Sequence, residues 1–151
     1  MYLKEATREL IDNFIMSDAD QKEQVASCNE YIFENPSEYD VIVDNENNTL
    51  ALGGVTEFGT IWLLTSYHVK KLGVSKQRKF VKLIRKQIEN YMRHNRHRAF
   101  LFNTVWEKNV DHIKFIESCG GFLVPEKAYK TPIGETFIPF LIPNPYHEGG
   151  N

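Results

Sequence analysis

The chain has 151 residues, of which 42% are hydrophobic and 25% are charged, and its formal net charge is −2. This length suits one domain, and the composition excludes low-complexity disorder and a miniature fold that needs disulfides to hold it together. No stretch approaches the roughly 20 apolar residues that cross a membrane, so no membrane span is expected.

Cysteine usage and the N-terminus bear on compartment and on metal binding. Cys28 and Cys119 stand outside any CxxC or Cys/His ligand spacing, which predicts free thiols and no metal site. The N-terminus lacks the apolar segment of a secretory signal. We therefore expect the protein in the cytosol of the cell that makes it, unless it is packaged or exported by another route.

Charge is segregated along the chain. Residues 1–50 hold twelve acids and three bases, whereas residues 70–98 hold eleven bases and one acid. Such a basic stretch indicates either an anionic partner, such as nucleic acid bound without sequence preference, or a solvated helix face that the acidic half compensates. The sequence leaves these two interpretations open.

The N-terminal half predicts two helices among short strands. A first strand is expected over 2–6, followed by a helix over 8–16 with apolar residues at helical spacing, and Ser17 or Asp18 can cap a second helix that reaches about residue 31. Three strands then follow at 39–43, 49–54 and 60–65. The last is almost entirely apolar, which is typical of a central strand.

The C-terminal half contains the clearest helical pattern. Ser75 is expected to cap a helix over 75–93 whose apolar stripe is Phe80, Ile84, Ile88 and Tyr91. A strand at 99–105 follows, and then a helix that Asn109 caps and residues 119–121 end. Strands at 122–124 and 136–142 complete a single domain over 1–142, and residues 143–151 are expected to form a flexible tail.

This order of elements predicts a mixed α/β (α+β) fold. A strand, a long helix and another strand should form one right-handed parallel crossover, whereas the preceding strands form an antiparallel meander. The sheet is therefore expected to be mostly antiparallel and flanked by helices.

The order of elements resembles the GNAT acyltransferase superfamily over about residues 2–142. The segment 109–122 is similar to the superfamily pattern of an Asn, an apolar helix and a Gly-Gly-Phe before a strand. The runs 51–54, 61–66, 79–84 and 112–115 resemble a GNAT-like family of internal virion proteins of short-tailed phages, over about residues 40–125. This resemblance implies a phage-encoded protein found in the host cytoplasm or in the virion.

The GNAT resemblance implies a set of acetyl-CoA contacts. Leu64 and Thr65 stand where a strand pairs with the pantetheine arm, and Asn109 opens the helix of the superfamily pattern. The diphosphate would sit at the start of the long helix, where backbone N–H groups attract anions. In the superfamily this turn has two small residues, which let the backbone approach the diphosphate closely. If Ile84 matches the leucine of the superfamily helix, Lys79 and Val81 stand at these two positions. The residues that would then face the phosphates are Lys76, Gln77, Arg78 and Lys79.

Acetyl transfer to an amine also needs a base and an acid. Glu57 and Glu107 are the candidate bases, and Tyr67 is the candidate acid, because Ile116 stands where many GNAT enzymes have a proton-donating tyrosine. His112, early in its helix, is expected to be an exposed polar residue.

Three functions remain open at this stage. The first is an acetyl-CoA-dependent N-acetyltransferase acting on an amine. The second is a catalytically degenerate GNAT-fold protein that contacts phage structural proteins during virion assembly or genome ejection. The third is non-specific nucleic-acid binding through residues 70–98, for which phosphate contacts suffice.

Overall fold

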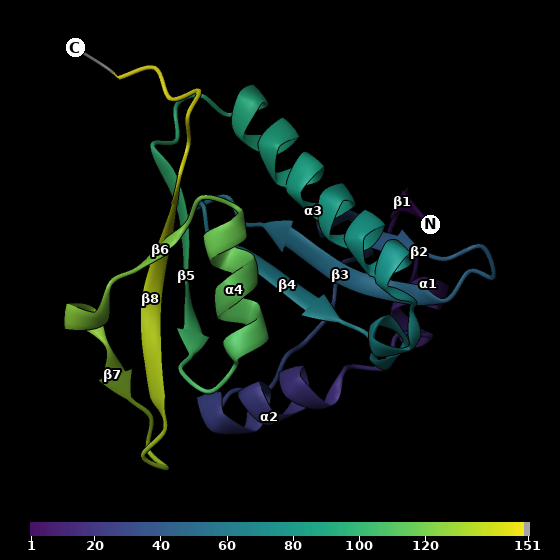
Figure 1. The fold of residues 1–151 in the computed structure, drawn as a ribbon, viewed down its shortest axis with the longest axis horizontal. Coiled ribbons are helices and arrows are strands. Elements are labelled where there is room, and N and C mark those ends of the chain that lie inside the picture. Colours follow the sequence, from purple (N-terminus) through teal and green to yellow (C-terminus); the bar gives the residue numbers. More distant parts are fainter. Residues whose placement is uncertain (150–151) are drawn as a thin grey trace.

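The computed structural model describes residues 1–149, and two sheets splay apart in it beneath a long helix (Figure 1). The strands are β1 (Tyr2–Glu5), β2 (Asp40–Val43), β3 (Thr49–Val55), β4 (Ile61–Thr65), β5 (Phe100–Trp106), β6 (Phe122–Leu123), β7 (Tyr129–Lys130) and β8 (Thr136–Pro143). The α-helices are α1 (Arg8–Asp12), α2 (Asp18–Ser27), α3 (Val74–His94) and α4 (Val110–Ser118). Short 3₁₀ turns are η1 (Pro36–Glu38), η2 (Tyr67–Lys71) and η3 (Pro125–Lys127).

Both sheets are antiparallel within themselves. The first has the order β1-β2-β3-β4, and the second has the order β5-β8-β6, with β7 also paired to β8. The expected crossover β4-α3-β5 is present, but β4 and β5 meet through a single parallel bridge between Thr60 and Phe102. The predicted fold class is thus confirmed, with the sheet parted at the crossover.

A different helix covers each face of the first sheet. On one face, α3 packs Phe80, Ile84, Ile88 and Met92 against strand residues of both sheets. On the other, α1 packs Leu10 and Ile11 against β2 and β3. Tyr91, which the sequence placed on the buried stripe of α3, is half-buried, and Met92 lies at the end of the stripe instead.

Several predicted element boundaries are wrong. Gly73, rather than Ser75, is the N-cap of α3. The second helix ends at Ser27 because Cys28 adopts a left-handed conformation (φ 59°), which stops the α-helical hydrogen-bond ladder. The N-cap role of Asn109 is confirmed, since its side chain accepts the N–H of His112.

The stretch after β8 packs against the end of α3. Asn144 is buried, and its Nδ2 donates to the carbonyl oxygens of Met92 (3.0 Å) and Arg98 (3.0 Å). Residues 150–151 of the expected tail lie outside the described residues. No helix within residues 1–149 has the length and apolarity needed to cross a bilayer.

Candidate functional site

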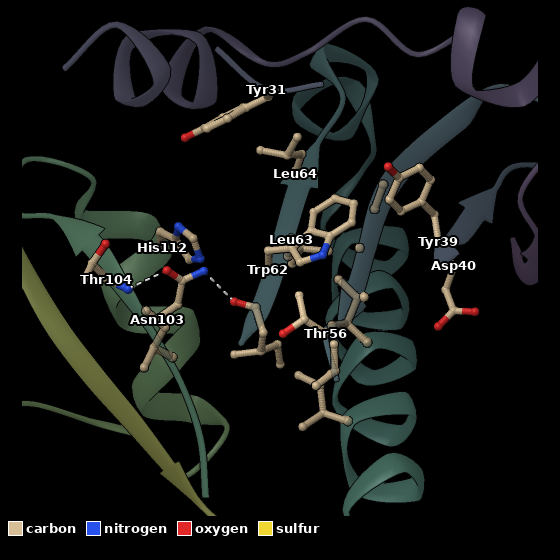
Figure 2. A pocket seen from close by; sticks show the side chains of 18 of the residues that line it. Tyr31, Tyr39, Asp40, Thr56, Trp62, Leu63, Leu64, Asn103, Thr104 and His112 are labelled. Carbon is tan, nitrogen blue, oxygen red and sulfur yellow. Dashed lines mark hydrogen bonds between the residues drawn. The ribbon is translucent and has the colours of Figure 1, made fainter. Parts of the chain in front are cut away.

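The site lies at the split between β4 and β5. Beside the bridge at Thr60, the side chain of Asn103 donates from Nδ2 to the carbonyl oxygen of Ile61 (2.7 Å), and this bond ties the strands at their narrow end (Figure 2). Beyond it no ladder pair joins β4 to β5 within residues 1–149, so the strands diverge.

A cavity of about 610 Å³ occupies this split. In Figure 2, Leu63 and Leu64 extend from β4 on one side, and Thr104 and His112 lie on the other, with Tyr31 above them. Such a volume is within the range of small-molecule pockets. The site therefore has room for a ligand between the two sheets.

Backbone groups along the free edge of β4 differ in what they bind. Ser66 donates its N–H to the carbonyl oxygen of Leu50 in β3 (2.8 Å). Because hydrogen bonding alternates along an antiparallel pair, Leu64 also points its polar groups at β3, whereas Leu63 and Thr65 point theirs at the split. Leu63 therefore directs its backbone N–H and C=O toward the cavity.

Helix α2 lies across the wide end of the split and contacts both sides of it (Figure 1). Asp20 and Glu23, here called the α2 carboxylate pair, are three residues apart and share one face of the helix. The Oδ2 atom of Asp20 accepts the backbone N–H (2.7 Å) and the hydroxyl (2.9 Å) of Thr65 in β4. Asp20 thus takes the N–H group that Thr65 directs at the split.

Glu23 binds the opposite side of the split. Its Oε1 accepts the backbone N–H of Trp106 in β5 (2.7 Å), and its Oε2 accepts Nδ2 of Asn109 (3.0 Å). The Nδ1 atom of His112 lies 3.5 Å from Oε2. Burial acts to raise the pKa of Glu23, but the interactions with His112, Trp106 and Asn109 outweigh it and lower the pKa below its usual value. Glu23 is therefore a buried carboxylate that remains ionised.

Tyr31 carries the most perturbed phenol of the site. Burial, together with the negative charges of Glu23 and Asp20, raises its pKa to about 12, and a hydrogen bond with Ser27 partly opposes this rise. Its hydroxyl stays protonated at neutral pH, so it can donate a hydrogen bond into the cavity.

The start of α3 is open. A Cβ atom added to Gly73 would meet nothing within 4 Å, and no side chain caps the helix. Lys76, Arg78 and Lys79 are exposed, whereas Gln77 folds back and donates to the carbonyl oxygen of Leu72 (2.9 Å). Exposed cations and uncapped N–H groups are compatible with an anion at this end of α3.

The three expected catalytic residues lie apart from the cavity, since none of them lines it. Glu57 is exposed in the β3–β4 turn, and Glu107 is exposed after β5. Tyr67 packs against His68, with Nζ of Lys71 4.5 Å from its ring centre. Ile116, at the superfamily tyrosine position, is buried in the core.

The expected cofactor contacts divide into two groups. Thr65 and Asn109 bind the α2 carboxylate pair, and the backbone polar groups of Leu64 face β3, whereas the backbone groups of Leu63 remain directed at the cavity. Lys76, Arg78 and Lys79 remain exposed at the start of α3.

Sequence reasoning missed Asp20, Glu23, Tyr31 and the inward position of His112. His112 was expected to be exposed, but its side chain is only 21% exposed because it lies against Glu23. The one available signal was the three-residue spacing of the two acids, and nothing in that spacing predicts their burial.

Comparisons with known proteins identify both a family and a fold. The family model described as "Bacteriophage T7, probable scaffold protein Gp13" matches residues 40–127, more than half of the chain. No curated protein matches the chain in sequence.

Three solved structures are similar at low sequence identity. Chaetomium thermophilum Naa20 in complex with a bisubstrate analogue has a TM-score of 0.58 and 14% identity, over 95% of this chain and 86% of that one. The Escherichia coli ribosomal-protein alanine N-acetyltransferase has a TM-score of 0.55 and 15% identity, over 99% and 96%. A Vibrio cholerae spermidine N-acetyltransferase chimera has a TM-score of 0.53 and 12% identity, over 95% and 97%. At these identities the likeness shows the GNAT fold alone.

Proposed function

Since the chain belongs to the family described as bacteriophage T7 probable scaffold protein Gp13, we propose that it is a GNAT-fold phage protein that acts in particle assembly and does not transfer acetyl groups. The observation that carries this proposal is the α2 carboxylate pair, because it engages Thr65 on one side of the split and Asn109 on the other. These are two of the residues that the GNAT resemblance assigns to acetyl-CoA binding.

The hydrogen-bond energies of the α2 carboxylate pair favour keeping α2 across the split between β4 and β5. A hydrogen bond to a charged group contributes about 1.5–3 kcal/mol, and a buried carboxylate that loses its donors costs more than that. A pantetheine arm paired with Thr65 would have to replace the bonds that Asp20 makes to this residue. The site therefore disfavours this cofactor unless α2 moves away.

A surface on the second sheet supports a role in protein contacts. Phe100 and Phe102 alternate with buried residues of β5 and are 45% and 36% exposed, and Phe122 of β6 is 49% exposed. Phe102 and Phe122 both pair with Leu141 of β8, so all three rings share the face opposite α3 and α4. We call Phe100, Phe102 and Phe122 the aromatic face. Contiguous exposed apolar groups of this kind are typical of protein interaction sites.

Acetyl transfer is a second candidate, favoured by the 610 Å³ cavity with Leu63 at its edge. This candidate requires α2 to release both strands, and it would act on an amine with acetyl-CoA as donor. The exposed bases of α3 are also compatible with non-specific nucleic-acid binding, as a further role of an assembly protein.

Complementation of a phage that lacks this gene tests the proposal. Phe100→Ser with Phe102→Ser should abolish or strongly reduce particle yield, whereas Ile133→Ser, an exposed apolar control outside this face, should not. A variant with Glu57→Gln, Glu107→Gln and Tyr67→Phe should complement fully. The reverse pattern, with the face variant active and the triple variant inactive, would support an enzyme and contradict an assembly role.

A further inference from the structure

A cluster of three potential metal ligands lies where α2 meets α4. Asp20, Glu23 and His112 each offer one ligand atom, and these atoms all lie within 4.8 Å of one another. Asp20 and Glu23 are 5% and 6% exposed, so two carboxylates are packed together almost out of water. Burying two like charges is costly, and hydrogen bonds offset this cost most fully when a cation is also present.

No lysine or arginine among residues 1–149 forms an ion pair with either carboxylate. Among residues 1–149, the only ion pair made by either carboxylate is that of Glu23 with His112, which is charged only when protonated. Nδ1 of His112 is itself buried, and it forms no hydrogen bond with any described group. A buried nitrogen without a hydrogen-bond partner beside two carboxylates is the feature that a bound cation would explain.

The spacing of Glu23 and His112 fits two metal ligands better than a hydrogen bond. Nδ1 of His112 and Oε2 of Glu23 are 3.5 Å apart, whereas a charge-assisted hydrogen bond between them would be about 2.7–2.9 Å long. Zinc binds nitrogen and carboxylate oxygen at about 2.0–2.2 Å, and two such ligands at a tetrahedral angle stand about 3.4 Å apart. The observed separation therefore matches two ligands of one Zn²⁺ ion.

The surroundings of the cluster hold the ligands in place. Oδ2 of Asp20 is fixed by the N–H and hydroxyl of Thr65, and Glu23 is fixed by Trp106 and Asn109. Hydrogen bonds of this kind orient ligating side chains in metal sites. Glu23 and His112 also line the cavity, which provides a path of entry and room for a water ligand.

We propose that Asp20, Glu23 and His112 form a binding site for one divalent transition-metal ion, best suited to Zn²⁺, that fastens α2 to α4 and closes the wide end of the split. This site differs from the sequence expectation of no metal. His112 lies about 90 residues from the two carboxylates, so no local spacing could indicate the complete set of ligands.

Calorimetric titration of the chelator-treated protein with Zn²⁺ alone tests the proposal. The expected result is one ion per chain with micromolar or tighter affinity, and a Tm that rises with Zn²⁺ and falls with EDTA. Because loss of a supporting residue typically weakens binding about 10–100-fold, His112→Gln and Asp20→Asn, which remove ligands, should each weaken it by at least about 100-fold. His97→Gln, an exposed control, should leave it unchanged.

Binding of Co²⁺ provides a readout that does not depend on stability. The wild-type protein should develop the visible absorption of tetrahedral Co²⁺, and folded Asp20→Asn protein should not. Absence of stoichiometric Zn²⁺ binding would overturn the proposal, and so would binding that survives both ligand substitutions.

Discussion

Replacing Glu23 by Gln should destabilise the fold, because this side chain joins α2 to β5 and α4. The carboxylate accepts from both Trp106 and Asn109, whereas a glutamine offers a single oxygen. Its own amide group must then face one of the two donors. Losing one charge-assisted bond and leaving a buried donor unsatisfied should cost about 2–4 kcal/mol.

Urea unfolding in the presence of EDTA measures this cost without any metal contribution. Glu107→Gln is the matched control, since Glu107 is exposed, and it should change the free energy of unfolding by less than about 0.5 kcal/mol. If Glu23→Gln falls within the same limit as the control, α2 does not depend on its carboxylates, and the account of a closed split is refuted.

The pH dependence of the same pair provides an independent check. Because the pKa of Glu23 is lower in the folded state, the unfolded chain takes up the proton at higher pH. The stabilisation is therefore complete above the unfolded-state pKa and is lost as pH falls through the folded-state pKa. The difference in free energy of unfolding between wild type and Glu23→Gln should therefore decrease below about pH 4.5. A difference that stays constant at lower pH would contradict the stabilising role of ionised Glu23.

Other features of the structure yield further expected outcomes. In metal-free protein, ¹³C NMR of the tyrosine ring should show Tyr31 titrating near pH 12, and Glu23→Gln should lower that pKa because one of the charges that raise it is gone. Gly121→Ala should lower Tm, since its Cβ would lie 2.7 Å from a side-chain carbon of Ile116, and a cost of about 1–3 kcal/mol is typical of overpacking. Asn144→Ala should cost about 1–3 kcal/mol by leaving buried carbonyl oxygens at the end of α3 unpaired, and faster amide hydrogen exchange there would report it.

Patterns local in sequence predicted much of the fold. The stripe Phe80, Ile84 and Ile88 identified α3, and the side chain of Asn109 identified the start of α4, because each depends on contacts within a few residues. The predicted start of α3 at Ser75 and the predicted end of α2 at about residue 31 were wrong, because caps and left-handed residues are set by how the chain turns in space.

The candidate site was far less predictable. Glu57, Glu107 and Tyr67 were chosen for their chemistry near strand ends, and the structure places them outside the cavity. Asp20 and Glu23 gain their importance from burial against β4 and β5, through contacts 45 and 83 residues away. No periodicity or motif carries that information, because the splay of the two sheets brings these groups together.

We propose that the α2 carboxylate pair closes the split between β4 and β5 to acetyl-CoA. Calorimetric titration of the purified protein with acetyl-CoA tests it most directly. With the split closed, we expect no binding heat at millimolar cofactor and no rise in Tm. Micromolar binding that Lys76→Glu with Lys79→Glu weakens would contradict it, because the cofactor would then occupy the start of α3 with the split open.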